Sequence, residues 1–185
     1  MEIRTKRLLL RPLGLGDLAT AYAYSSDPEA TRFMVRLPVS DIAETKSFLR
    51  AAEAEWRREE PSYYEFAIVR EGIHIGAVSV YLSAEGTEGE RGWILDRRHW
   101  RHGYATEAAE AVRDFATGAL GVRRLVAHCD AENFASRRVM EKLGMALAGR
   151  THGRINRAGG GPREEYMYAL DAKGEERTSR AAAPL

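Results

Sequence analysis

Cysteine is almost absent from this chain. The single residue, Cys129, excludes an intramolecular disulfide and therefore a secreted scaffold held together by disulfides. No Cys-x-x-Cys pair occurs, and the five histidines show no spacing typical of ligands. No metal site is predicted.

Long apolar runs are also lacking. No stretch approaches the ~20 residues that a membrane-spanning helix needs. The chain begins with the charged segment Met1–Arg4 and continues into alternating sequence, which does not resemble a signal peptide. We therefore expect a cytoplasmic protein without a membrane partner.

An excess of charge of either sign is missing as well. The chain has 28 basic and 27 acidic side chains, which leaves a formal net charge of +1. Such a balance gives no overall field that attracts nucleic acid or an anionic membrane. A nucleic-acid binder that uses arginine pairs such as Arg137-Arg138 is an alternative, but the charge and the absence of a known binding motif disfavour it.

The remaining composition is that of one globular domain. Apolar residues make up 44% of the 185 residues, and nothing forces an internal boundary. We place the domain at residues 1–170. Residues 171–185 are charged and then alanine-rich, and we expect them to be disordered.

Patterns of alternation and helical spacing predict a mixed α/β order. The expected strands are residues 3–13, 64–69, 73–81, 90–95, 124–129, 145–151 and 164–170. The expected helices begin at Asp17 and near Ser40 and then cover residues 103–120 and 135–143.

The most informative stretch joins the strand at residues 90–95 to the helix that follows. The first turn of a helix presents unpaired N–H groups and suits a phosphate. Gly103 allows close approach of a ligand to the backbone, and Arg98, Arg101 and His102 add positive charge there. An ordinary strand-to-helix turn is the alternative for these residues alone, and neither a Walker loop nor a Rossmann fingerprint is present.

These residues resemble the phosphate-binding motif of the Gcn5-related N-acetyltransferases, Arg/Gln-x-x-Gly-x-Gly/Ala. Arg98 to Gly103 match the motif except at Arg101, where arginine replaces the first glycine. The opening segment Thr5–Leu13 and the segment Asn133–Met145 are similar to the branch that acetylates the amino termini of ribosomal proteins.

The resemblance implies a fold and an activity. The fold is a mixed central sheet of about six to seven strands flanked by about four helices, with acyl-CoA bound where the central strands splay apart. The activity is transfer of an acetyl group from acetyl-CoA, the cosubstrate, to a primary amine. The acceptor is the amino terminus of a protein or a small-molecule amine, and the enzyme is a monomer or a homodimer.

The resemblance also implies which residues bind the cofactor. Backbone amides of residues 101–106 hold the pyrophosphate, strand 93–95 binds the pantetheine arm, and an N–H near Leu95 polarises the thioester carbonyl. Asn133 contacts the CoA arm. The full set is Trp93, Ile94, Leu95, Arg98, Arg101, His102, Gly103, Tyr104, Ala105, Thr106, Asn133 and Ser136.

Acid–base roles follow from the chemistry of amines. An alkyl ammonium has a pKa near 10 and must lose a proton before it attacks a thioester. Glu90 stands where the family often places a glutamate for this step, and the alternative is a solvent-facing strand residue. Glu164 and Glu165 are further candidates for the base or for recognition of a cationic acceptor.

The departing thiolate benefits from a proton donor. Many relatives use a tyrosine seven residues after the motif asparagine, but Met140 stands at that position. Ser136 occupies the position that the ribosomal branch uses instead, and helix capping is its alternative role. Cys129 has no histidine partner in the expected context, so we expect a buried strand residue and direct transfer without an acyl-enzyme.

Two questions stay open at this level. A sensor of the same fold that binds acyl-CoA and transfers nothing is compatible with the departures at Arg101 and Met140. The acceptor pocket is expected between the first helices and the loop at residues 159–162, which the resemblance does not specify.

Overall fold

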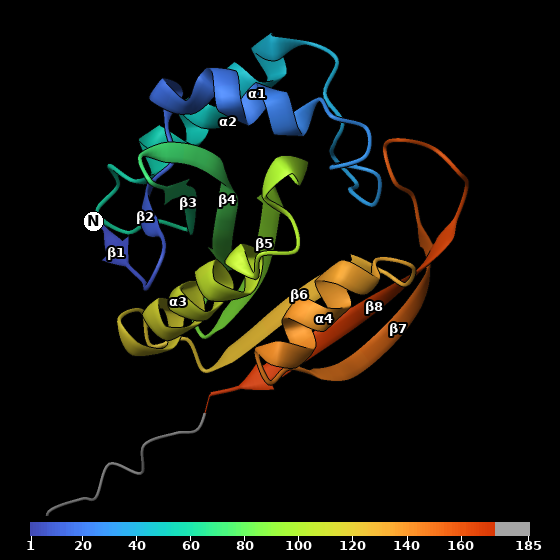
Figure 1. Ribbon diagram of the computed structural model, residues 1–185. Coiled ribbons are helices and arrows are strands. Elements are labelled where there is room, and N and C mark those ends of the chain that lie inside the picture. Colours follow the sequence, from blue (N-terminus) through green and yellow to red (C-terminus); the bar gives the residue numbers. More distant parts are fainter. Residues whose placement is uncertain (173–185) are drawn as a thin grey trace, which may run out of the picture.

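A computed structural model describes residues 1–172 of the chain. Its centre is an eight-stranded sheet in the order β1-β2-β3-β4-β5-β6-β8-β7 (Figure 1). The strands are β1 (Ile3–Arg4), β2 (Leu9–Pro12), β3 (Tyr63–Arg70), β4 (Ile73–Leu82), β5 (Glu88–Leu95), β6 (Arg124–Asp130), β7 (Ala146–Arg154) and β8 (Arg163–Asp171). The α-helices are α1 (Leu18–Ser25), α2 (Ile42–Glu55), α3 (Tyr104–Gly118) and α4 (Phe134–Lys142), with 3-10 turns η1 (Leu15–Asp17) and η2 (Arg97–His99).

Only one pair of neighbouring strands in this sheet runs parallel. β5 and β6 are joined by a crossover through α3 and therefore point the same way, whereas every other pair is antiparallel. Parallel strands connected through a helix place that helix against one face of the sheet. The crossover thus brings the start of α3 to the carboxyl end of β5.

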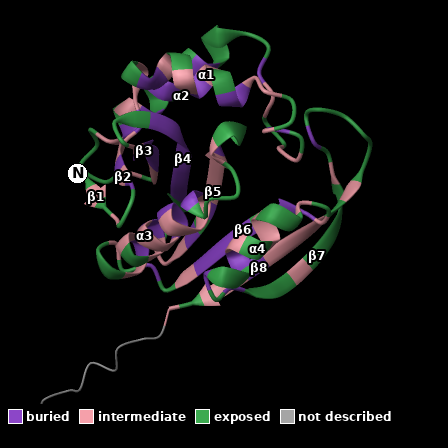
Figure 2. Cartoon of the chain, in the orientation of Figure 1, coloured by how far each residue is buried: buried purple, intermediate pink, exposed green. Residues whose placement is uncertain are grey.

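Two cores lie on the two faces of the sheet. α3 and α4 cover one face, where the larger cluster includes Phe66, Ile68 and Val112. α1 and α2 cover the other face, where Leu13 and Leu49 pack with alternate residues of β3 and β4. Figure 2 shows the consequence: β3 and β4 are buried along most of their length, while β7 at the sheet edge is largely exposed. Because β3 and β4 are covered on both faces, neither strand presents a solvated face to the region around α1 and α2.

Local signals explain where the helices begin. The Asp41 side chain accepts a hydrogen bond from Ala43 N and caps α2, so that helix starts just after the predicted Ser40. Asn133 Oδ1 accepts from Ser136 N at 3.1 Å and caps α4. Gly103 precedes α3 with φ +79°, a left-handed conformation that glycine adopts without strain.

The sheet has one strand more than the six to seven expected. The predicted strand at residues 3–13 is divided into β1 and β2, because Thr5 N donates to Leu8 O at 2.9 Å and closes a turn between them. The β4–β5 and β3–β4 hairpins follow the predicted order.

Beyond β8, most of the segment predicted to be disordered, residues 171–185, lies outside the described residues. No helix within residues 1–172 combines the length and apolarity needed to cross a membrane. The same residues contain no group of three or more His, Cys, Asp or Glu side chains placed to hold a metal ion.

Candidate active site

β5 and β6 form a fork at the centre of the sheet. They pair only over Glu88–Glu90 and Arg124–Val126, after which β5 continues to Leu95 along β4 and β6 continues to Asp130 along β8. Beyond Glu90, no other strand of the described chain pairs with β5 on this side. Backbone N–H and C=O groups require partners. The free edge of β5 can therefore bind an extended amide-containing arm, as a sheet edge binds an added strand.

The loop after β5 brings a helix N-terminus to the mouth of this fork. Asp96 caps η2 by accepting from Arg98 N, and two left-handed residues then follow, Arg101 at φ +64° and Gly103 at φ +79°. Arg101 thus adopts the conformation that favours glycine, at the position where the family motif has one. The substitution leaves this left-handed turn in place, and the first amides of α3 are available to a pyrophosphate.

Arg7 is a candidate cofactor-side residue that the sequence reasoning missed. Its Nη1 donates to His102 O at 2.9 Å, and its guanidinium lies 4.6 Å from the centroid of the Tyr104 ring. Glu107 fixes it by accepting from Arg7 N at 2.8 Å and from Arg7 Nε at 2.7 Å. Burial raises the pKa of Glu107, but hydrogen bonds from Thr5 and Arg7 outweigh this and hold it below the usual value. A positive charge therefore stands beside the start of α3, and the Thr5–Leu13 motif was the available signal.

Arg98 is engaged elsewhere. Its Nη2 donates to Asp96 Oδ2 at 2.6 Å, and the ion pair holds the pKa of Asp96 below its usual value. The Arg98 side chain is 75% exposed, so it can exchange this partner for a phosphate at little cost.

Other predicted cofactor residues lie on β5 and at the start of α4. Trp93 lies on the α3 face of β5 and Ile94 lies on the opposite face. Leu95 is the last residue of the strand. The side-chain oxygen of Asn133 already has a partner, because it accepts the hydrogen bond from Ser136 N that caps α4. Ser136 is therefore not the cap, and it lies one helical turn before the buried Met140 on the same face. The phenol that many relatives place at position 140 has no counterpart in the apolar side chain of Met140.

Cys129 is buried on β6, as predicted. Burial raises the pKa of its thiol to about 11, so it is protonated at neutral pH. A protonated thiol is a poor nucleophile, which agrees with transfer that involves no acyl-enzyme at this residue.

Glu90 stands where the fork opens. It is the last residue of β5 paired with β6, facing Val126, and on the other side it faces Tyr81 of β4. The side chain is exposed. Register places it on the same face of the sheet as Tyr81, the face that α1 and α2 cover. A carboxylate at this point can reach a group that enters the fork from that face.

Glu164 and Glu165 lie on β8, on the far arm of the fork. Glu165 forms an ion pair with Arg154, and its Oε2 lies 3.6 Å from His128 Nδ1. Glu164 is exposed and faces His152 of β7. Glu165 therefore has a structural partner in Arg154, whereas Glu90 forms no ion pair among residues 1–172.

Glu65 is a second residue, after Arg7, that could not be identified from the sequence. It is only 6% exposed, on β3, and accepts a hydrogen bond from the Tyr81 hydroxyl at 2.5 Å. Burial raises its pKa to about 7, although the Tyr81 hydrogen bond acts in the opposite direction. The alternation of residues 64–69 predicted a strand, but it gave no sign that helices α1 and α2 would cover the face on which Glu65 lies.

Two segments far apart in the sequence meet beyond the fork. The connection between α1 and α2 is held to the end of β7 and the connection that follows it by a side-chain and a main-chain contact: Arg154 Nη2 donates to Phe33 O at 2.9 Å and Arg157 N to Met34 O at 3.0 Å. Arg157 also forms an ion pair with Glu44 at 2.9 Å. The expected acceptor pocket joins these same two segments, and the contacts bring them together.

Asp130 anchors the second of these loops at the end of β6. It is 1% exposed and accepts from Asn156 Nδ2 at 2.7 Å, from Glu132 N at 2.9 Å and from Arg163. Burial raises the pKa of Asp130, but the hydrogen bonds from Arg163, Glu132 and Asn156 hold it below the usual value. The loop is thus fixed by ionised side chains.

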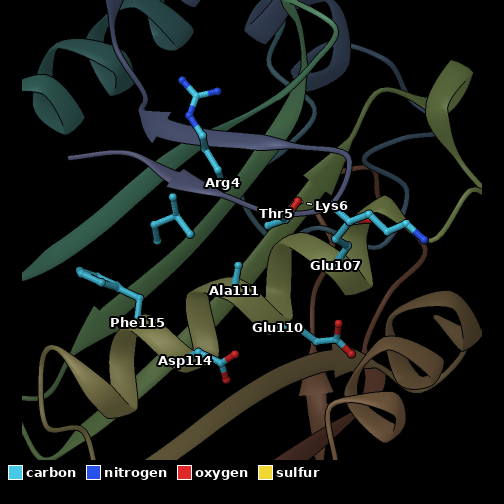
Figure 3. A pocket seen from close by; sticks show the side chains of 9 residues that line it. Arg4, Thr5, Lys6, Glu107, Glu110, Ala111, Asp114 and Phe115 are labelled. Carbon is cyan, nitrogen blue, oxygen red and sulfur yellow. Dashed lines mark hydrogen bonds between the residues drawn. The ribbon is translucent and has the colours of Figure 1, made fainter.

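A separate groove of about 570 Å³ lies on the outer side of α3 (Figure 3). Residues of β1 and the following turn form one wall, and Glu110, Asp114 and Phe115 of α3 form the other. Thr5 Oγ1 and Glu107 Oε1 close one end with a hydrogen bond of 2.6 Å. None of the predicted site residues lines this groove, so it belongs to the packing of the amino terminus.

Comparison with known proteins shows the family to which the chain belongs. Residues 7–146 match the family model described as "Acetyltransferase (GNAT) domain". The uncharacterized N-acetyltransferase YnaD of Bacillus subtilis is 30% identical over 92% of this chain and 96% of its own length.

Solved structures show the same fold. A GNAT-family acetyltransferase from Bacillus anthracis superposes with a TM-score of 0.78 at 26% identity, covering 92% of this chain and 98% of its own. The ribosomal-protein-S5-alanine acetyltransferase from Vibrio fischeri superposes with a TM-score of 0.79 over 92% of this chain and 96% of its own. Its identity is 17%, so this second likeness concerns the fold.

Proposed function

Because the chain belongs to the GNAT acetyltransferase family, it is an acetyl-CoA-dependent acyltransferase, and we propose that it acetylates a primary amine by direct attack on the thioester. The observation that carries the proposal is the fork between β5 and β6. Its free backbone edge begins at Glu90 and leads to the left-handed turn before α3. The acceptor is a protein amino terminus or a small-molecule amine, and the opening segment supports the ribosomal branch.

The residues present fit acetyl-CoA, which supplies an activated acetyl thioester. We assign the pyrophosphate to the backbone amides of residues 101–106, where Gly103 has no Cβ and Arg7 adds charge. The pantetheine arm is assigned to β5 from Trp93 to Leu95, whose edge lacks a strand partner among the described residues. Asn133 and Ser136 approach the arm from the start of α4.

The proposed chemistry uses two side chains and one amide. Glu90 removes the proton of the ammonium, directly or through a water, so that the neutral amine attacks the carbonyl carbon. The N–H near Leu95 donates to the carbonyl oxygen as charge develops there. The C–S bond then breaks, and the Ser136 hydroxyl stabilises the departing sulfur.

The test is release of free CoA thiol from acetyl-CoA, with and without an acceptor panel. The panel contains amino-terminal peptides of ribosomal proteins, diamines, aminoglycosides and amino acids. Thiol release that depends on one class establishes transfer and identifies the acceptor. Binding of acetyl-CoA without release above the no-acceptor control would favour a sensor of the same fold, and failure to bind acetyl-CoA would refute the proposed function.

A further inference from the structure

Glu65 is a buried acid for which the acetyl transfer described above has no use. It is 6% exposed, yet only one of its oxygens has a partner, the Tyr81 hydroxyl at 2.5 Å. Oε2 accepts no hydrogen bond from any residue that the structure describes. Within residues 1–172, the fully enclosed side-chain nitrogen and oxygen atoms without a partner are both on Arg91, so Glu65 Oε2 keeps some contact with solvent.

The carboxylate is held rigidly. Glu65 O accepts from Leu13 N at 2.9 Å and from Trp56 Nε1 at 2.8 Å, which fixes the strand beneath the side chain. Tyr63 stacks on Tyr81 with ring centroids 4.8 Å apart and fixes the phenol that binds the carboxylate. An acid that is buried, oriented and half-satisfied has already lost solvation without gaining a cationic partner.

No basic side chain within residues 1–172 supplies that partner. Among these residues Glu65 forms no ion pair, and its side chain accepts only the hydrogen bond from the Tyr81 hydroxyl. The groups around it are the phenols of Tyr24 on α1, Tyr63 on β3 and Tyr81 on β4. The positive charge of Arg36, in the loop after α1, opposes the rise in the pKa of Tyr81 that burial causes.

The register connects Glu65 to the fork. Glu65 faces Ser79 on β4, and Ser79 faces Gly92 on β5, so these three residues form one row on the face that α1 and α2 cover. The two residues that follow Glu65 in this row are small, since Ser79 carries a hydroxymethyl group and Gly92 a hydrogen. Ser79 Oγ lies 3.1 Å from where a Cβ of Gly92 would stand, so a larger residue at 92 would crowd this row.

Distance decides between two roles for this carboxylate. Neighbouring strands are about 4.8 Å apart, so β3 and β5 are separated by about 10 Å. That separation is too long for Glu65 to take a proton from an amine attacking at β5. It matches the length of a short chain between two amino groups.

We propose that Glu65 is a specificity-determining residue, which pairs through Oε2 with a second, positively charged group of the acceptor. This inference rests on the proposed function. The acceptor class is an amine that carries a second cationic group several bonds from the amine that is acetylated. Glu90 serves the reacting amine, and Glu65 serves the remote one.

The test compares cadaverine with the amino alcohol of the same carbon chain, in which a hydroxyl replaces one ammonium. We expect the wild-type kcat/KM to favour cadaverine by about tenfold or more, since a pair that is partly buried is worth more than a surface pair. Glu65→Gln should remove this preference and leave the KM for acetyl-CoA unchanged. Because the readout is a ratio of two acceptors, a general loss of activity cancels.

Two further variants separate recognition from structure. Glu55→Gln removes a buried acid at the end of α2, whose Oε1 accepts from Ser62 Oγ at 2.7 Å, and should leave the ratio unchanged. Tyr81→Phe keeps the carboxylate but removes the hydrogen bond that lowers its pKa. The preference requires ionised Glu65, so it should grow as pH rises through about 7 in the wild type and at higher pH in Tyr81→Phe.

A Glu65→Gln variant that keeps the full preference for cadaverine would overturn the inference, as would a wild type that has none. Acetylation of the amino alcohol reports the proposed function independently of Glu65. If neither amine is acetylated, the proposed function fails for these acceptors. Calorimetric titration of cadaverine onto the CoA-bound wild type and Glu65→Gln then still decides the inference, since equal affinity contradicts it and a tenfold loss supports it.

Discussion

The two sides of the fork are built by different means. On the side of α3, the arrangement depends on main chain: a free strand edge, the left-handed turn at Arg101 and Gly103, and the first amides of a helix. On the side of the two loops, it depends on side chains, among them Arg154 and Asp130, that join segments far apart in the sequence. We propose that the first side binds the cofactor largely through its main chain. The second side can change acceptor by exchanging a few charged residues.

Glu90 lies where the two sides meet, and its replacement should have the largest effect. Glu90→Gln keeps the shape of the residue but removes the proposed base, so we expect kcat to fall by about 1000-fold, within the range for general base catalysis. The KM for acetyl-CoA should stay within about twofold, because cofactor binding does not use this side chain. Steady-state kinetics at saturating acceptor measure both.

The matched comparison is Glu164→Gln on the far arm of the fork. It should leave kcat within about threefold, as expected for an exposed residue away from the reacting amine. A large loss in Glu164→Gln together with near-normal activity in Glu90→Gln would move the base to the loop side and break the comparison.

Asp130→Asn tests whether charged side chains hold the loop side together. Removing the carboxylate leaves Arg163 without its main buried partner, and we expect the free energy of unfolding to fall by about 2–3 kcal/mol, allowing for partial exposure. The acceptor KM should rise while acetyl-CoA affinity is retained. Urea denaturation and calorimetry measure these effects. Asp114→Asn, which removes an acid on α3 that is 68% exposed, is the control with little change.

The pH dependence of stability gives a further test of the ion pair between Asp130 and Arg163. The pKa of Asp130 in the folded state lies below the ordinary 3.8, so its contribution is fully present above that pH. The contribution is lost as pH falls through the lowered pKa. The stability of wild type should therefore fall more steeply in acid than that of Asp130→Asn, and parallel curves would show that the carboxylate contributes nothing.

Gly103→Val tests the main-chain side. Gly103 has φ +79°, where a β-branched residue is strained, and the new side chain would stand beside the turn to which we assign the pyrophosphate. We expect acetyl-CoA affinity to weaken by about 30-fold, or about 2 kcal/mol. Gly118→Ala, at the other end of α3 with no atom within 4 Å of the new Cβ, should bind acetyl-CoA normally. Equal affinity in both variants would contradict the role of the turn.

The same division explains what the sequence could predict. The apolar stripe of α3 and the turn before it are local features, so residues 103–120 closely predicted the observed Tyr104–Gly118. The candidate cofactor residues followed from two local motifs, the stretch before this helix and the segment Asn133–Met145. The order of strands and helices along the chain was also within reach, because alternation and helical spacing are local patterns.

The loop side was beyond that reach. The hydrogen bond between Arg154 and Phe33 O joins residues 121 positions apart, and no pattern in either segment announces it. The burial of Glu65 was equally out of reach, because alternation identifies the two faces of a strand but cannot show that helices α1 and α2 cover the face on which Glu65 lies. Both the Arg154–Phe33 contact and the burial of Glu65 arise from tertiary packing, which leaves no local pattern in the sequence.

Arg101→Gly should have the smallest effect and gives the finest test of the main-chain side. Arg101 is held at φ +64°, and glycine relieves the strain of about 1–2 kcal/mol, while the greater freedom of glycine in the unfolded chain offsets about half. We expect a net gain of about 0.5 kcal/mol in stability. Glu71→Gly, at φ +50° in the β3–β4 turn, is the matched control and should gain as much.

Acetyl-CoA affinity separates the two variants of that pair. If the amides of the turn hold the pyrophosphate, loss of the Arg101 guanidinium should weaken binding by only about threefold, comparable to one surface charge at a helix end. Glu71→Gly should not change affinity at all. A loss above about 30-fold in Arg101→Gly would mean that the arginine has replaced the glycine as a phosphate ligand in its own right. In that case the cofactor side, too, would owe its affinity to side chains, and the contrast between the two sides of the fork would not hold.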